Sequence, residues 1–548
     1  MSPSILPLPA DVQAAPGQFG VPEVFQTELI GEAGPALAHL QRLLPELSFA
    51  PCQSEPDLSL RQDAQRAELG TEGYELRVGP AGIVLCAAAP AGLFYGVVTL
   101  WQLLRGQPSV ACLQITDTPR FGWRGLMLDA ARHFIPVPDL LRVLDELARL
   151  KLNVFHWHLT DDQGWRLLVP AYPDLIRVGS RRARTLVGHL QGTPHTFDER
   201  PHGGFYSEAD IAQVLAYAAA RHITVVPEID LPGHAQAALV AYPEFGSGER
   251  AEVGEVWGIS ERVFHPRAQT MDFLRAVLGE VMRLFPGRYI CIGGDECPTT
   301  EWEASAEMRA LATTLGLSGP HTLQRYVTRE LCRYLLERGR VPIGWEEILD
   351  GDLGGDHSSS DDHSSGDDHP SGGDHPSSDD LSRQAVGLIW LREEQARPAV
   401  LAGHPVVICA HRHFYLDYYQ SASREGEPLA QGGCLSLRGA YDHDPLPPDL
   451  NPDQQRLVLG VQANLWTEYL PTPQRQEYML FPRLLAVAEL AWSPQAKRHF
   501  ADFEQRLSPH LGDLTRRGFS VRQPRPGDDP AAPDPAAINQ AAINPATE

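Results

Sequence analysis

Two adjacent carboxylates, Asp295 and Glu296, follow two glycines at the end of a short β-rich run, residues 289–292. Gly293 and Gly294 let the backbone approach a bound molecule closely, because neither carries a side chain. Mutual repulsion and partial burial are expected to raise the pKa of one of the two carboxyl groups, as a general acid near neutral pH requires. A solvated turn is the alternative, and the position at the end of a β-rich run disfavours it.

Polar and aromatic side chains also follow the other β-rich runs. The candidates in chain order are Arg132, Asp161, Asp230, His234, Trp345, Trp390, Tyr415, Asp417, Trp466 and Glu468. Such a set, without a phosphate or redox motif, suits a sugar, whose CH-rich faces pack on aromatic rings and whose hydroxyl groups pair with carboxylates and arginine. Glycoside cleavage also needs a carboxylic acid that protonates the leaving oxygen.

Single candidates also have ordinary structural explanations. Arg132 could pair with Asp129 in addition to binding a ligand. Asp161 could cap the segment that follows it, and His234, which comes after a Pro-Gly pair, could be an exposed turn histidine. A lone tryptophan is usually a core residue, but three at separate strand ends are harder to explain in that way.

Adjacent residues cannot easily flank a sugar ring from opposite sides. In a retaining glycosidase the acid and the nucleophilic carboxylate stand about 5 Å apart across the ring. If Glu296 is the acid, Asp295 is therefore poorly placed as the nucleophile. Either another carboxylate attacks or the substrate supplies its own nucleophile, and the spacing alone leaves both open. The other carboxylates are Asp161, Asp230, Asp417 and Glu468.

From about residue 119 onward, β-rich runs alternate with amphipathic helices, which is typical of βα units. The eight runs are 125–129, 153–159, 224–229, 289–292, 341–344, 386–390, 406–410 and 460–464. They predict an α/β fold, a (β/α)₈ TIM barrel, whose functional residues lie at the C-terminal ends of the strands. A doubly wound open sheet is the alternative, but no Gly-rich phosphate loop supports it. His156 and His158 alternate along the second run, so one of them could be an ordinary core histidine.

The barrel is expected over residues 119–522, preceded by a small α/β domain at 1–118. The expected elements of the small domain are strands at 75–78 and 82–87 and a buried helix at 92–104. Residues 351–380 contain nine Asp and no Lys or Arg, and this composition predicts a disordered insert. Its repeated Asp-His pairs leave a metal-binding tract as the alternative. The Pro/Ala-rich tail, 523–548, is also expected to be disordered.

Composition excludes several classes of protein. The 548 residues carry a net charge of −24 without any Lys/Arg run, which argues against a nucleic-acid partner. No apolar run approaches about 18 residues, so no membrane span is expected. Residues 1–17 lack the features of a signal peptide, and the expected location is cytoplasmic. Eight cysteines without a C-x-x-C pair predict reduced thiols, and no metal or cofactor is expected.

The chain resembles glycoside hydrolase family 20, the β-N-acetylhexosaminidases. Seven segments occur in the family's order: LDAARHF, KLNVFHWHLTDDQGWR, PEIDLPGHAQA, IGGDE, GWEE, YLD and ANLWTEY. The resemblance runs from the small domain to about Trp492, apart from the insert. It implies an exo-acting enzyme that removes terminal β-linked N-acetylglucosamine or N-acetylgalactosamine from an oligosaccharide or glycoconjugate. The 2-acetamido carbonyl of the substrate would attack its own anomeric carbon, giving an oxazolinium intermediate with overall retention.

The resemblance also implies roles for single residues. Glu296 matches the general acid and Asp295 the residue that holds the acetamido nitrogen, which resolves the geometric problem of two adjacent carboxylates. Asp161 and His234 match a dyad that supports the acid, and Arg132 matches the arginine that binds the 3- and 4-hydroxyls. Tyr415 matches the tyrosine on the acetamido oxygen, and Asp417 and Glu468 match the carboxylates on the outer hydroxyls. Trp345, Trp390 and Trp466 match the aromatic walls, and Asp230 resembles a support residue.

Two positions depart from the family pattern. Cys291 stands where the family usually has His, and Ala131 stands where it often has Ser. Both are expected to alter packing rather than chemistry. Two other functions remain as alternatives: a silent sugar-binding protein, against which the presence of Asp295 and Glu296 argues, and a barrel glycosidase with a protein nucleophile, which would cleave plain glucosides.

Overall fold

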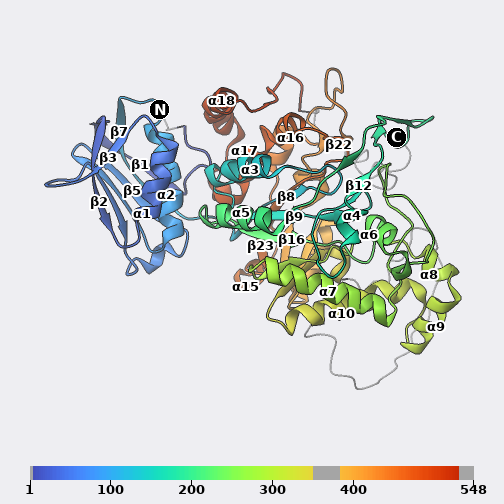
Figure 1. Cartoon of the computed structure of the whole chain (residues 1–548). Helices are drawn as coiled ribbons and strands as arrows, with labels where there is room; N and C mark the ends of the chain where they lie inside the picture. Colours follow the sequence, from blue (N-terminus) through green and yellow to red (C-terminus); the bar gives the residue numbers. More distant parts are fainter. Residues whose placement is uncertain (1–3, 350–382, 530–548) are drawn as a thin grey trace.

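The computed structural model describes residues 4–349 and 383–529. These residues form two parts, an N-terminal sheet with two helices and a closed barrel surrounded by helices (Figure 1). The predicted insert, 351–380, lies outside the described residues. Within the described part, no helix has the length and apolarity needed to cross a membrane.

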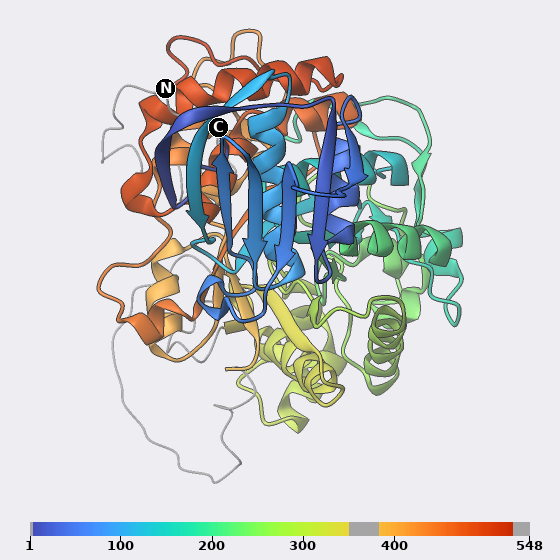
Figure 2. The same cartoon turned by 90° about the vertical axis from the view of Figure 1, so that its left-hand side faces the viewer.

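The N-terminal sheet has seven strands in the order β1-β7-β5-β6-β4-β2-β3. They are β1 Asp11–Gly20, β2 Val24–Ile30, β3 Ser48–Pro51, β4 Leu58–Gln62, β5 Tyr74–Gly79, β6 Gly82–Ala87 and β7 Ser109–Asp117. Helices α1, Gly34–Leu43, and α2, Pro90–Leu104, cover one face, and Figure 2 shows the sheet from the other. A Cβ at Gly96 of α2 would lie 2.3 Å from Leu85, so glycine permits this close packing.

Eight parallel strands close the barrel in the order β16-β17-β18-β19-β20-β23-β8-β9. They are β8 Trp123–Asp129, β9 Val154–His158, β16 Thr224–Glu228, β17 Tyr289–Cys291, β18 Val341–Trp345, β19 Val386–Ile389, β20 Val406–Ile408 and β23 Val458–Leu465. Each corresponds to one of the eight β-rich runs. The predicted (β/α)₈ barrel is therefore confirmed.

Helices surround the barrel and cover the outer faces of its strands. The longer ones are α3 Val137–Arg149, α5 Glu208–Ala219, α7 Ala268–Leu284, α9 Ala306–Thr314, α10 Leu323–Leu336, α16 Pro473–Leu480, α17 Arg483–Trp492 and α18 Phe500–Arg516. The short ones are α4 Asp174–Arg177, α6 Gln236–Ala241, α8 Thr300–Ala304, α12 Ala396–Leu401, α13 His411–Phe414, α14 Leu437–Asp442 and α15 Pro452–Gln455. Ser207 and Asp210 form a reciprocal capping box at the start of α5, which satisfies two backbone N–H groups.

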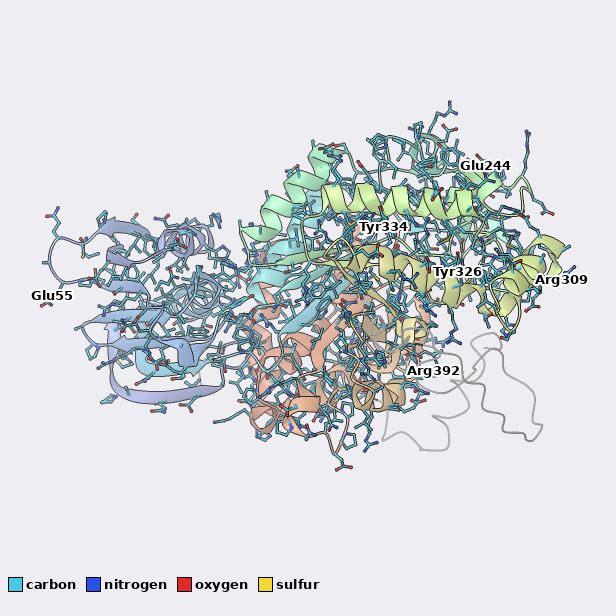
Figure 3. The ribbon with its side chains drawn as sticks, turned by 90° about the horizontal axis from the view of Figure 1, so that it is seen from below. Glu55, Glu244, Arg309, Tyr326, Tyr334 and Arg392 are labelled. Atoms are coloured by element: carbon cyan, nitrogen blue, oxygen red, sulfur yellow. The ribbon has the colours of Figure 1, made fainter. Side chains whose placement is uncertain are left out.

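Short two-stranded pairs lie in the loops between barrel elements. They are β10 Thr160–Asp161 with β11 Gly164–Trp165, β12 Arg181–Arg182 with β15 His202–Gly203, β13 Leu186–Val187 with β14 Thr196–Phe197, and β21 Tyr418–Tyr419 with β22 Gln431–Cys434. In Figure 3, Glu55, in the loop between β3 and β4, and Arg309 of α9 mark opposite ends of the molecule.

A buried ion pair joins the two parts. Lys151, at the start of the second barrel unit, lies 3.0 Å from Asp117 at the end of β7, and both side chains are fully buried. The Lys151 amine also donates to Tyr74, and the Trp492 indole donates to Asp117 from α17. The two parts therefore share polar groups that neither could satisfy alone.

All eight cysteines lie in the described part and are free thiols. Four of them, Cys112, Cys291, Cys332 and Cys409, are buried. Of the predicted tail, residues 523–529 are described, and Asp528 accepts two hydrogen bonds from Arg522 there. Residues 530–548 lie outside the described part.

Candidate active site

The C-terminal ends of the barrel strands bring the candidate residues together. Asp295 and Glu296 follow β17 in a tight turn that needs unusual backbone angles. Gly293 has φ +64°, and a Cβ there would lie 1.9 Å from a carboxylate oxygen of Asp230, so only glycine fits. The Gly294 amide donates to the same Asp230 oxygen at 3.2 Å, and Glu296 itself has φ +46°. Asp230, predicted as a support, thus fixes the turn that carries both carboxylates.

Asp295 and Glu296 differ in their environments. The Glu296 side chain is 37% exposed and that of Asp295 only 9%. Burial raises the pKa of Asp295 well above its usual range, and the negative charge of Asp230 adds to the effect. One oxygen of Asp295 is buried without a hydrogen-bond partner. Burial likewise raises the pKa of Asp230, to about 7.

Asp161 and His234 form a pair beside Glu296. Nδ1 of His234 lies 3.2 Å from Oδ1 of Asp161, and Nε2 lies 3.5 Å from Oε2 of Glu296. His234 is only 3% exposed, so it is not an exposed turn histidine. Burial acts to raise the pKa of Asp161, but the charges of Arg132 and His234 outweigh it and hold that pKa well below its usual range. Asp161 is therefore a carboxylate that can orient the imidazole.

Arg132 is buried between carboxylates and an aromatic ring. Its guanidinium lies 2.9 Å from Asp161 and 3.4 Å from Asp129, and it stands 4.8 Å from the ring centre of Trp466. Its Nε donates to the side-chain oxygen of Gln163. The pairing with Asp129 that the sequence left possible is thus present, and this anchoring fixes the direction in which the guanidinium points.

Four aromatic rings form one wall of the site. Trp345 lies against Trp390 and Trp466, with ring centres 6.3 Å and 5.7 Å apart. Tyr415 stacks on Trp390 at 6.3 Å. Trp345 is 1% exposed and its indole donates to Glu228, so it closes the floor of the site. The other three rings stand nearer the opening and suit the apolar faces of a sugar.

Asp417 and Glu468 complete the set. Asp417 is 3% exposed, and neither of its carboxylate oxygens has a hydrogen-bond partner. Burial raises its pKa well above the usual range, and the charge of Glu468 adds to this. Burial also raises the pKa of Glu468, against the opposing charge of Arg132. A buried carboxyl group without partners, next to a second carboxyl group, suits a site for hydroxyl groups.

Glu346 and Glu347 position Trp390. Glu346 accepts the backbone N–H groups of Trp390, Leu391 and Arg392, and it pairs with the Arg392 side chain at 2.7 Å (Figure 3 labels Arg392). Glu347 accepts from the Trp390 indole at 3.3 Å. Burial raises the pKa of Glu347 well above its usual range, and the charge of Asp295 adds to this. In the sequence, both residues directly follow the fifth β-rich run, but only the structure identifies Trp390 as their common partner.

Two other residues of the site were not among the sequence candidates. Glu228 ends β16, and His158 ends β9, directly beside it in the sheet register. Their signal was present in the sequence, because His156 and His158 are two residues apart and so face the same side of a strand. Both histidines are fully buried, and both lie within 3.0 Å of Glu228.

Some donors of the site lie close enough to share a cation. One such group is Asp230, His234 and Asp295, and another is Asp161, Asp162 and His234. In both groups His234 already faces the Asp161 carboxylate.

A closed (β/α)₈ barrel with buried carboxyl groups, an anchored arginine and tryptophans at its strand ends is typical of an enzyme that cleaves sugars. Comparison with known families agrees. Residues 121–495 match the catalytic domain of glycosyl hydrolase family 20, and residues 2–118 match domain 2 of that family. The chain therefore belongs to glycosyl hydrolase family 20, which makes it a glycoside hydrolase.

Similar proteins cover most of the chain. A β-hexosaminidase of Porphyromonas gingivalis is 37% identical over 84% of the chain, and one of Akkermansia muciniphila is 32% identical over 92%. The chain spans 55% of the length of the first relative and 96% of the second. The crystal structure of an exo β-N-acetylglucosaminidase from Vibrio harveyi with N-acetylglucosamine has 30% identity and a TM-score of 0.79, over 95% of this chain and 79% of that one.

Proposed function

We propose that the protein is a retaining exo-β-N-acetylhexosaminidase that uses the acetamido group of its substrate as the nucleophile. The observation that carries the proposal is the position of Asp295. It is buried next to Glu296 on one turn, with a carboxylate oxygen that has no partner. Such an oxygen suits an amide N–H of the substrate, whereas a carboxylate adjacent to the acid cannot reach the opposite face of the sugar.

The reaction then has two steps. In the first, Glu296 transfers its proton to the glycosidic oxygen, and the acetamido oxygen forms a bond to the anomeric carbon as the aglycone leaves. Asp295 accepts the hydrogen bond of the acetamido N–H and stabilises the positive charge of the oxazolinium ion. In the second step, the Glu296 carboxylate takes a proton from water, whose oxygen attacks the anomeric carbon and reopens the ring. Two inversions give net retention.

The other candidates bind the terminal sugar. Asp417 and Glu468, with Arg132 beside them, accept and donate hydrogen bonds to its hydroxyl groups. Trp390 and Trp466 pack on its apolar surfaces, and Tyr415 donates to the acetamido oxygen. The substrate class is an oligosaccharide or glycoconjugate ending in β-linked N-acetylglucosamine or N-acetylgalactosamine. The relatives' names and the N-acetylglucosamine bound in the Vibrio harveyi enzyme support this class.

Paired 4-nitrophenyl β-glycosides test the proposal. We expect turnover of the 2-acetamido glucoside or galactoside and no turnover of the plain glucoside, since the latter lacks the nucleophile. A thiazoline that mimics the bicyclic intermediate should inhibit competitively and more tightly than N-acetylglucosamine. Equal turnover of the plain glucoside would point to a protein nucleophile. Binding of N-acetylglucosamine without any turnover would point to a silent binding protein.

A further inference from the structure

Glu228 is a fully buried carboxylate beneath the candidate site. In the sheet register it stands beside His158 of β9 on one side and Cys291 of β17 on the other. Its Oε2 lies 2.5 Å from Nδ1 of His158 and 3.0 Å from Nε2 of His156. Its Oε1 accepts from the Trp345 indole at 2.9 Å and from the Cys291 thiol at 3.4 Å. Neighbouring strands therefore converge on one negative charge.

His158 lies between two carboxylates. Nδ1 faces Glu228, and Nε2 lies 2.8 Å from Oδ2 of Asp161. A neutral imidazole carries one N–H and can donate to only one of the two, whereas an imidazolium donates to both. Burial acts to lower the pKa of His158, but the charge of Glu228 and the hydrogen bond to Asp161 outweigh it and raise that pKa well above its usual range. His158 is therefore held as an imidazolium.

The chain of contacts continues to the candidate acid. Asp161 uses Oδ2 for His158 and presents Oδ1 to Nδ1 of His234, 3.2 Å away. Nε2 of His234 then faces Glu296. The members of this chain come from the ends of β9, β16 and β17, so the barrel itself fixes their order.

We propose that Glu228 is a positioning residue, which acts through His158 and Asp161 to hold His234 in place against Glu296. The inference rests on the proposed role of Glu296 as the acid. Glu228 does not touch the substrate pocket and does not transfer a proton to the substrate. Its charge keeps His158 protonated, and the imidazolium, together with Arg132, holds Oδ2 of Asp161, so that Oδ1 faces Nδ1 of His234 and Nε2 of His234 points toward Glu296.

Loss of the Glu228 charge has a specific consequence for pH dependence. His158 would then face only one close carboxylate and would lose a proton at a lower pH. Asp161 would then lose the positive charge of His158 and keep only Arg132 as a charged partner of Oδ2, and its hold on His234 would weaken. The titratable groups that act on Glu228 or His158 from the surrounding strands and loops are His156, Asp129, Asp161, Asp230, Cys291, Asp295 and Cys409.

The Glu228→Gln variant of the full chain tests the proposal, because glutamine keeps the shape and removes the charge. With the 4-nitrophenyl 2-acetamido glucoside as substrate, we expect the alkaline limb of kcat/KM to move to lower pH by about one unit. At the alkaline end, kcat should fall about 10-fold while KM changes little, since the pocket residues are untouched. Glu228→Asp keeps the charge and should restore most of the alkaline limb.

Glu489→Gln is the matched control. Glu489 of α17 is also a fully buried carboxylate, but its partners Arg506 and Tyr441 are not residues of the site. This variant should lose thermal stability without any shift of the pH profile. An equal loss of activity at every pH in Glu228→Gln would mean that Glu228 only supports the structure, and it would overturn the proposal.

A second readout does not depend on activity. In protein with isotope-labelled histidine, the ring nitrogens of His158 should both remain protonated from pH 6 to pH 9 in the native chain and should titrate in Glu228→Gln. A neutral His158 in the native chain would overturn the inference even if the enzyme is active. Lack of turnover on 2-acetamido substrates, with His158 still charged, would instead count against the proposed function alone.

Discussion

The imidazole of His234 faces the carboxylate of Glu296, with Nε2 3.5 Å from Oε2, and both residues have the left-handed backbone angle φ +46°. Backbone angles of this kind are unfavourable for residues other than glycine and persist only where the surrounding structure fixes them. Here the two turns, after β16 and β17, aim the side chains at each other. The contact is therefore a property of the fold.

Replacing Glu296 by Gln should remove the proton donor of the first step and the base of the second. The first step is measured by kcat/KM, which we expect to fall by about 10²–10⁴-fold on substrates with poor leaving groups. A 2,4-dinitrophenyl leaving group needs no proton, so the loss should be much smaller on that glycoside. Because the side chain is 37% exposed, the melting temperature should change little. Equal losses on both leaving groups would contradict the role of Glu296 as the acid.

Asp295→Asn should inactivate the enzyme and stabilise the fold. Burial raises the pKa of this carboxyl group, and the negative charge of Asp230 adds to the effect. When the pKa of a carboxyl group is raised in the folded state, the group destabilises the fold as the pH rises above its unfolded pKa, about 3.9. We therefore expect the free energy of unfolding of Asp295→Asn to exceed that of the native chain by about 1 kcal/mol or more at pH 7, and the gain to vanish near pH 3.

Denaturant unfolding at several pH values measures this difference. Activity on the 2-acetamido glucoside should fall at least about 100-fold in the same variant, since the proposed mechanism needs the charge of Asp295 to stabilise the intermediate. A gain in stability that is the same at pH 3 and pH 7 would show that its cause is not ionisation of Asp295.

The sequence predicted the barrel well because its strands are short apolar runs with polar residues at their ends. It predicted less of the N-terminal sheet, where only β5 and β6 were expected. Strand β1 pairs at an edge of the sheet, is mostly exposed and has a register shift between Ala14 and Gln18. Such a strand lacks the apolar alternation on which a sequence prediction depends.

For the site, strand ends and motif order were enough to select the candidates, but not their partners. Glu228 and His158 are far apart in sequence and become neighbours only through the register of β9 and β16. For His234, the alternative of an exposed turn histidine is wrong, because the residue follows a Pro-Gly pair and yet is buried. Long-range register and burial are properties of the packed barrel, and no local pattern encodes them.

Lys151→Met should lower the free energy of unfolding, because it breaks the buried ion pair between the two parts of the molecule. It leaves Asp117 as a buried charge with only neutral donors, which costs about 3–5 kcal/mol. Adding Asp117→Asn should recover part of the loss, since the unpaired charge is then gone. Arg456→Met, which breaks an exposed pair with Asp453, is the control and should have no measurable effect. A Lys151→Met chain as stable as the native one would show that the interface does not depend on this pair.

Buried neutral histidines should make the fold sensitive to acid. Burial and the charge of Arg105 lower the pKa of His510 on α18 to about 3, and its Nε2 lies 3.0 Å from the Ser4 carbonyl oxygen. Between pH 6.5 and about pH 3, His510 binds a proton in the unfolded chain but stays neutral in the folded chain. The free energy of unfolding should therefore fall by about 1.4 kcal/mol per pH unit for this group down to about pH 3.

The difference between the native chain and His510→Gln isolates this group from other histidines. The variant should have a shallower decline in unfolding free energy between pH 6.5 and pH 3. His195→Gln changes an exposed residue and should leave the slope as it is. If both variants decline as steeply as the native chain, His510 is not protonated on unfolding.

Gly293 and Gly294 provide a matched pair for the turn that carries Asp295 and Glu296. Both have positive φ, +64° and +100°, so alanine at either position costs about 1 kcal/mol or more in backbone strain. Only at Gly293 would the new Cβ also collide with Asp230, whereas nothing lies within 4 Å at Gly294. Gly293→Ala must therefore displace Asp230 or the turn itself. We expect it to lose nearly all activity and several degrees in melting temperature, with Gly294→Ala much less affected in both. Comparable losses in the two variants would mean that backbone strain alone, rather than the contact with Asp230, makes glycine necessary in this turn.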